Sequence, residues 1–146
     1  MLNIFPSIIA QCLIVENGHL YANRVKHFLN RLPCVNVIGI ATTGNEVSDI
    51  ITQYQQLDII IIGCGGSNSH AFEIARLLRE LTLCMVIVGD DCQSALQALQ
   101  TGADYFFVKP LHRSTFNSKI RDLLNIKLQK KEILLTDNSL RIPVHL

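Results

Sequence analysis

Four short apolar segments of this chain end next to the best candidates for a functional site. The residues at or just after those ends are Glu16 and Asn17, Gly63, Gly89, and Lys109 with Pro110. A carboxylate and a lysine at neighbouring strand ends are typical of sites that hold phosphate or a hard cation. In contrast, the segment "LDIIIIGCGG" at 57–66 ends in glycines and supplies no charged or nucleophilic side chain. Any chemistry at these ends must therefore proceed without a side chain from that segment.

The segments that carry these residues alternate between strand and helix patterns. Apolar runs predict five strands, at 11–16, 34–41, 58–63, 84–89 and 104–108. Apolar residues at three- and four-residue spacing predict five helices, within 21–32, 43–54, 71–81, 93–101 and 116–124. Alternating units with strands too apolar to face water predict an α/β fold, a doubly wound (βα)5 parallel sheet covered on both faces. In such sheets the site lies beyond the carboxyl ends of the strands.

Composition argues against several other classes of protein. The chain has 146 residues, a formal net charge of +1 and 49% hydrophobic residues, so it is long enough for one well-packed domain and has no basic footprint for nucleic acid. Its apolar runs are too short to span a bilayer, and its start lacks the basic region of a signal peptide. The five cysteines have no paired spacing, and the histidines are scattered. We therefore expect a cytoplasmic protein with reduced thiols and no metal site.

From about Gln11 to Leu124 the chain resembles the receiver domain of bacterial two-component response regulators, the CheY-like family. The motifs that carry the resemblance are "LIVEN", "TTGNE", "LDIIII" and "GADYFFVKP". The last is the most specific, because Lys109 and Pro110 stand where the family has a lysine and a cis-proline turn. The resemblance implies a flavodoxin-like three-layer sandwich with sheet order 2-1-3-4-5. It also implies a role in phosphorelay signal transduction, often in transcription regulation.

The matching motifs imply the family's fold, but several residues that the family needs for phosphorylation differ in this chain. An ordinary receiver accepts a phosphoryl group on an aspartate that ends its third strand, while an acidic pair holds Mg²⁺. A Ser or Thr at the end of the fourth strand and an aromatic residue on the fifth then move the switch. The matching positions of this chain hold Glu16, Asn17, Gly63, Gly89 (or Val88), Phe106, Lys109 and Pro110. Because Gly63 has nothing to phosphorylate, the resemblance implies a pseudo-receiver with a degenerate phosphorylation pocket.

Several roles stay open for the residues of this pocket. Lys109 either binds an anion or is neutralised by Glu16, which is the only candidate metal ligand and predicts no Mg²⁺ site by itself. Asp90, with its neighbour, either gives the pocket a permanent negative charge or starts a helix. The loop Gly63–Ser69 and Lys109 support an alternative function, a small-molecule or nucleotide sensor, although the loop matches no nucleotide motif. Cys64 is either an oxidant sensor or an inert thiol. No nucleophile–base pair converges on the strand ends, so we expect no enzyme and no cofactor.

The C-terminal residues are a separate segment in this interpretation. Residues 1–126 are the receiver-like domain, and 127–146 are a linker and a β-hairpin-like tail, because apolar residues alternate over Leu140–Leu146 after a turn at 137–139. The run "ILLTDNSLRIPV" is similar to the opening hairpin of LytTR-type DNA-binding domains. The tail is thus either the start of an output domain, through which alone DNA would be bound, or an arm that pairs with this domain or a second copy.

The resemblance also indicates how such a module acts. The family signals through the face formed by its fourth helix, fifth strand and fifth helix, which here spans about 93–124. We expect a homodimer through this face, with a signalling protein as a further partner.

Overall fold

The computed structural model describes residues 9–54, 57–65 and 70–141, with side chains up to 129. Five strands form one parallel sheet in the order β2-β1-β3-β4-β5. The strands are β1 (Ala10–Val15), β2 (Val35–Ala41), β3 (Leu57–Cys64), β4 (Thr82–Gly89) and β5 (Tyr105–Val108). Strand order and parallel pairing confirm the doubly wound, flavodoxin-like fold that the sequence predicts.

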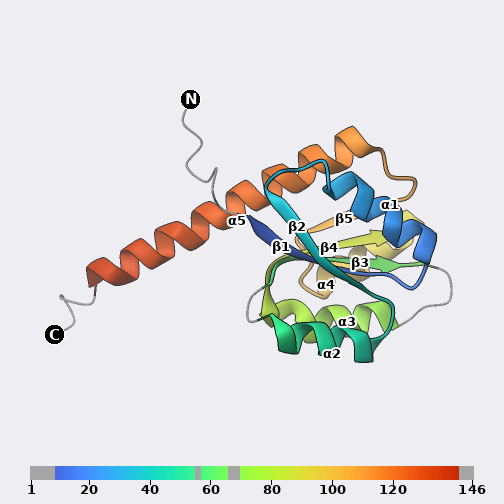
Figure 1. Cartoon of the computed structure of the whole chain (residues 1–146), viewed down its shortest axis with the longest axis horizontal. Coiled ribbons are helices and arrows are strands. Elements are labelled where there is room, and N and C mark those ends of the chain that lie inside the picture. Colours follow the sequence, from blue (N-terminus) through green and yellow to red (C-terminus); the bar gives the residue numbers. More distant parts are fainter. Residues whose placement is uncertain (1–8, 55–56, 66–69, 142–146) are drawn as a thin grey trace.

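Helices cover both faces of this sheet (Figure 1). They are α1 (His19–Leu29), α2 (Gly44–Gln53), α3 (His70–Leu78), α4 (Ala95–Gln100) and α5 (Arg113–Arg141), with single 3-10 turns η1 (Arg79–Leu81) and η2 (Cys92–Ser94). One core cluster joins α1 and α5 to the sheet, and a second joins α2, α3 and α4 to its other face. No helix in the described ranges is long and apolar enough to cross a membrane.

The four isoleucines of β3 occupy the centre of the molecule. Ile59–Ile62 are at most 1% exposed, and they pair with β1 on one side and β4 on the other. Successive side chains of a strand point to opposite faces, so these residues contribute to both core clusters in turn. A strand covered on both faces needs no polar residue along its length, which explains the run.

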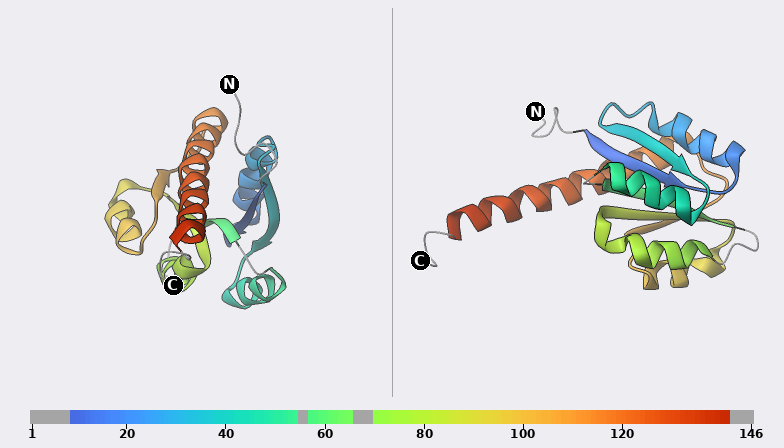
Figure 2. Two further views of the ribbon diagram at one scale, coloured as in Figure 1. Left: turned by 90° about the vertical axis from the view of Figure 1, so that its left-hand side faces the viewer. Right: turned by 60° about the horizontal axis from the view of Figure 1, so that its bottom comes forward.

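Helix α5 is longer than the sequence predicts. It leaves the sheet and continues as one helix to Arg141 (Figures 1 and 2). This helix takes the place of the linker and β-hairpin-like tail predicted for 127–146, of which 142–146 lie outside the described residues. The physical reason is that no glycine or proline lies between Leu111 and Ile142, so nothing in the sequence stops the helix once its core stripe has formed.

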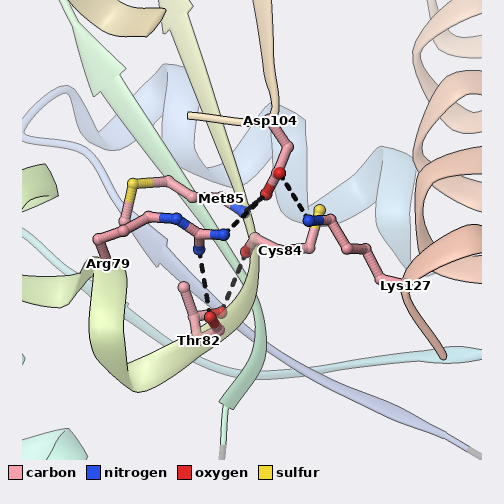
Figure 3. Close-up of polar contacts among 6 residues, drawn as sticks. All are labelled: Arg79, Thr82, Cys84, Met85, Asp104 and Lys127. Atoms are coloured by element: carbon pink, nitrogen blue, oxygen red, sulfur yellow. Dashed lines mark hydrogen bonds and ion pairs between the residues drawn. The ribbon is translucent and has the colours of Figure 1, made fainter. Parts of the chain in front are cut away.

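A charged cluster fastens α5 to the sheet near the start of β5 (Figure 3). The Asp104 carboxylate accepts a hydrogen bond from the Met85 amide at 2.8 Å and pairs with the Lys127 ammonium of α5 at 2.8 Å. The Arg79 guanidinium lies 3.5 Å from the same carboxylate. Burial, with the Asp104 charge, raises the pKa of the Cys84 thiol to about 12. The partly buried carboxylate thus links η1, β4, β5 and α5 at one point.

Candidate functional site

The candidate site lies where the carboxyl ends of four strands meet. Gly63 of β3 is opposite Val88 of β4, and Gly89 of β4 is opposite Val108 of β5. Lys109 follows β5 directly, and its amide donates a hydrogen bond to the Gly89 carbonyl at 2.9 Å. The parallel register therefore brings together residues that are separated by almost a hundred positions in the sequence.

The carboxylate of Glu16 fills the space above Gly63. A Cβ atom at position 63 would lie only 2.6 Å from Cδ of Glu16 and would overlap Oε1 of the same carboxylate. Glu16 is 8% exposed, and its Oε2 accepts a hydrogen bond from the Gly18 amide at 2.9 Å. The space in which a side chain from the end of β3 would begin is thus occupied by a carboxylate from the end of β1.

Lys109 lies between two carboxylates and an aromatic ring. Its ammonium is 3.7 Å from Oε1 of Glu16 and 3.4 Å from Oδ1 of Asp90. The same nitrogen lies 4.0 Å from the centroid of the Tyr21 ring, a cation–π distance. Of the two roles open for Lys109, the geometry agrees with neutralisation by Glu16. Two carboxylates therefore lie beside one ammonium at the strand ends.

Asp90 and Asp91 have different environments although they are adjacent. The Asp90 carboxylate rests against the backbone of Gly65, where a Cβ atom would be 2.7 Å from Oδ2. Asp91 instead accepts a hydrogen bond from the Gln93 amide at 3.0 Å and caps the turn η2. Asp90 therefore contacts the pocket through Lys109, and Asp91 caps the turn η2.

The aromatic ring of Phe106 covers Gly89. A Cβ atom at position 89 would lie 2.6 Å from Cζ of this ring and 3.2 Å from Sγ of Cys64. The ring packs against the core cluster that includes α2, α3 and α4. Because glycine leaves the space empty, the ring sits where a Ser or Thr side chain at position 89 would begin.

Cys64 is a poor candidate for an oxidant sensor. It is 5% exposed, and burial, followed by the Asp90 carboxylate, raises the pKa of its thiol to about 11. The thiolate is the reactive form, so the raised pKa and the burial of this thiol argue against a role in sensing oxidants.

The remaining predicted site residues have smaller roles in this geometry. Asn17 is exposed, and Pro110 follows Lys109 through a cis peptide bond. Residues 66–69 of the loop proposed for a sensor lie outside the described residues. Within the described ranges, no three His, Cys, Asp or Glu side chains converge as a metal site would require. Sequence reasoning missed Tyr21, which fits the apolar stripe of α1 and gives no separate signal.

Solved structures with a similar arrangement were found, whereas no protein-family model matches the chain. A signal receiver domain of the putative response regulator NarL from Mycobacterium tuberculosis is 22% identical, with a TM-score of 0.68 over 81% of this chain and 98% of that one. The response regulatory domain of mrkE from Klebsiella pneumoniae is 16% identical, with a TM-score of 0.71 over 82% of this chain and 98% of that one. This chain has the receiver-domain fold.

A third similar structure contains two signalling proteins. It is the P1 domain of CheA3 in complex with CheY6 from R. sphaeroides, and the match is 18% identical, with a TM-score of 0.64 over 82% of this chain and 99% of that one. Structural similarity at sequence identities in this range establishes the fold of our chain alone. Its function must be argued from the pocket itself.

Proposed function

We propose that this protein is a pseudo-receiver: a signalling module of the response-regulator type that acts through protein–protein contact without aspartyl phosphorylation. The observation that carries the proposal is the Glu16 carboxylate seated on Gly63. The pocket has no side chain at the acceptor position, and the space for an incoming phosphoryl group faces two carboxylates. Negative charge beside this position disfavours an incoming anion, most of all at the buried Glu16.

The same contacts favour a site that works without Mg²⁺ or any other cofactor. One oxygen of Glu16 accepts the Gly18 amide, and the other faces the Lys109 ammonium. A divalent cation at this position would have to displace Lys109 and would find no carboxylate at Asn17 or Gly63. A hard cation with several oxygen ligands to satisfy binds such a site poorly. With no metal and no nucleophile, we propose that the module is not an enzyme.

The position of Phe106 supports a module fixed in one signalling state. In a receiver that uses phosphorylation, a Ser or Thr side chain on β4 and the aromatic residue on β5 respond to the phosphoryl group. Here the ring of Phe106 already occupies the space in which such a side chain at position 89 would begin. A partner that binds the surrounding face would therefore find the same conformation whether or not a phosphodonor is present.

The surface for that contact is the face of α4, β5 and α5. Leu96 and Leu99 of α4 are 67% and 52% exposed, and Val108 of β5 is 38% exposed. Exposed apolar residues on adjacent elements favour a protein partner, and a second copy of the chain is the simplest one because symmetric dimers are the commonest soluble oligomers. We propose a cytoplasmic homodimer that contacts a signalling protein, with DNA bound only through an additional output domain.

Treatment with a phosphodonor tests this proposal directly. We expect that acetyl phosphate with Mg²⁺ leaves the intact mass of the chain unchanged, while a receiver that retains its aspartate, treated in the same tube, gains one phosphoryl group. An acid-labile adduct of one phosphoryl group, mapped to the strand-end pocket, would overturn the proposal.

A further inference from the structure

The charged residues of the chain are unevenly distributed over its elements. The segments 19–31 and 113–131 contain nine of the 13 Lys and Arg residues but only one of the 12 Asp and Glu residues, Asp122. The first segment forms α1 and the turn after it, and the second forms the greater part of α5. The net charge of +1, from which the sequence predicts no footprint for nucleic acid, therefore conceals a strong local excess of positive charge.

Helices α1 and α5 lie side by side on the same face of the sheet (Figure 1). Both follow strands of one parallel sheet, so they run in the same direction. The side-chain amide of Asn117 in α5 donates a hydrogen bond to the Phe28 carbonyl of α1 at 2.8 Å, and the Phe28 and Phe116 rings lie 6.2 Å apart between centroids. The contact between Asn117 and Phe28 thus sets which residues of the two helices lie at the same level.

Arginines lie before and after this contact in both segments. Arg24 in α1 and Arg113 in α5 each precede it by four positions, about one helical turn. Arg121 follows it by four positions in α5. Arg31 follows it in the turn after α1, where its amide donates a hydrogen bond to the Phe28 carbonyl at 3.1 Å. One arginine from each segment therefore lies at each of two levels.

The arginine seam formed by Arg24, Arg31, Arg113 and Arg121 is exposed and has no acidic partner. In the described part of the chain, every ion pair involves other residues. The only ring contact of the seam is that of the Arg24 guanidinium, 6.0 Å from the centroid of the Phe28 ring, among the residues that the structure describes. Positive charges without carboxylate partners disfavour one another, so a bound anion would relieve this repulsion.

The chemistry and the spacing of the seam fit the phosphate groups of a nucleic-acid duplex. A guanidinium presents paired N–H donors that match two oxygens of one phosphate. The two levels are about 12 Å apart along α5, close to the width of about 12 Å of the major groove of DNA. Within 24–31 and 113–121 no large apolar side chain is exposed, whereas a helix on a lipid surface buries such side chains. These observations favour nucleic acid over a membrane.

We propose that the arginine seam binds the phosphate backbone of duplex DNA and does not read its sequence. Each level contacts phosphates on one side of the groove, so α1 and α5 lie across it. Contacts with about four phosphates make the affinity strongly dependent on salt. The inference goes beyond the proposed function, in which an output domain holds the module on DNA. The seam adds a contact with the same duplex that is too weak to hold it alone at physiological salt.

Fluorescence anisotropy of a labelled duplex, titrated with the full 146-residue chain, tests this contact. With a duplex of about 20 base pairs and salt between about 50 and 200 mM, we expect log Kd to rise by about 3.6 per tenfold increase in salt. Arg113→Gln and Arg121→Gln, tested singly, should each lower this slope by about 0.9 and raise the Kd at low salt about threefold or more. A second duplex of unrelated sequence should give the same Kd within about twofold.

Arg76→Gln is the matched control. It makes the same change of charge at an exposed position of α3, which packs on the other face of the sheet, so its slope and Kd should match those of the natural chain within about twofold. The proposal is overturned if the natural chain leaves the duplex free at low salt, or if the control loses as much affinity as the seam variants.

Two other results would also overturn it. One is a Kd that differs about tenfold or more between the two duplexes, since backbone contacts carry no sequence information. The other is binding to phosphatidylserine vesicles by a chain that leaves the duplex free, which would make a lipid surface the partner. All of these results leave the proposed function standing, because treatment with a phosphodonor does not involve the seam.

Discussion

At the end of the sheet, the Glu16 carboxylate occupies the space that a side chain at position 63 would fill. This contact determines which charged groups face one another in the pocket. The carboxylate of Glu16 is able to approach the β3 backbone only because position 63 has no side chain. From there it forms an ion pair with Lys109, whose ammonium also pairs with Asp90. The charged groups that would contact a phosphoryl group in an ordinary receiver form ion pairs with one another here.

Gly63→Asp should damage this arrangement rather than restore a receiver. The new side chain forces the Glu16 carboxylate away from Lys109 and places two carboxylates side by side, so we expect the free energy of unfolding in urea to fall by about 1–3 kcal/mol. Removing the colliding group as well, in Gly63→Asp with Glu16→Ala, should recover part of that loss. Rapid stoichiometric phosphorylation of the single variant by acetyl phosphate would show that the acceptor position is assigned incorrectly.

Gly89→Ala should displace the ring of Phe106. The added methyl group would lie 2.6 Å from Cζ of the ring, so the ring or β4 must shift, at a loss of about 1–3 kcal/mol of folding free energy. Urea unfolding measures the loss, and nuclear Overhauser contacts between the ring and position 89 report the shift. Gly44→Ala is the control, because a Cβ atom there meets nothing within 4 Å. Equal stability of both variants with an unmoved ring would contradict the packing described above.

At the residue scale the sequence gives the residue types of the pocket but few of its contacts. That Gly63 offers no acceptor follows from the residue type alone. The pairing of Lys109 with Glu16 was one of two open roles, because the distance between them depends on how β1 and β5 lie across β3. The approach of Tyr21 to the same lysine depends on the path of α1 over the sheet, and no spacing in the sequence encodes that path.

At the scale of elements, the pattern of buried residues predicts the secondary structure of the core, whereas the secondary structure of the C-terminal segment is ambiguous from the sequence. The five strands and the helical stripes are set by which side chains avoid water, and period-two or period-3.6 patterns report that directly. Near the C-terminus the two patterns compete. Apolar residues alternate over Leu140–Leu146, which favours a strand, whereas the helix that already runs through the buried Leu124 and Leu128 continues to Arg141. Continuation of an existing helix adds one hydrogen bond per residue, while a new hairpin must be nucleated.

Among the contacts that join different elements, those of Asp104 should contribute most clearly to stability. Asp104→Asn keeps an acceptor for the Met85 amide but leaves Arg79 and Lys127 facing each other without a carboxylate. We expect a loss of about 1–3 kcal/mol in urea unfolding, since a partly buried cluster is broken from one side.

Hydrogen exchange provides a second measure of the same change. Amide exchange in α5 beyond Lys127 should quicken in Asp104→Asn, because the anchor between this helix and the sheet is weakened. The control is Asp49→Asn on the exposed side of α2, which should change the free energy of unfolding by less than about 0.5 kcal/mol. If Asp104→Asn is as stable as this control, the cluster does not hold α5.

At the scale of the whole molecule, the proposed function requires the module to act through its surface. Glu16 and Phe106 occupy the space beside Gly63 and Gly89 at the strand ends, and the face of α4, β5 and α5 presents exposed apolar residues beside an open groove. The central claim is that this face is competent for contact at all times, because the molecule's own side chains hold the switch position.

The measurement that tests this claim most directly is the dimer Kd of the natural chain, determined by sedimentation with and without acetyl phosphate and Mg²⁺. We predict a dimer in both conditions, with Kd values that agree within about twofold, because nothing in the pocket responds to the phosphodonor. A chain that is monomeric alone and dimeric after treatment, or a Kd that tightens by about tenfold or more, would contradict the account.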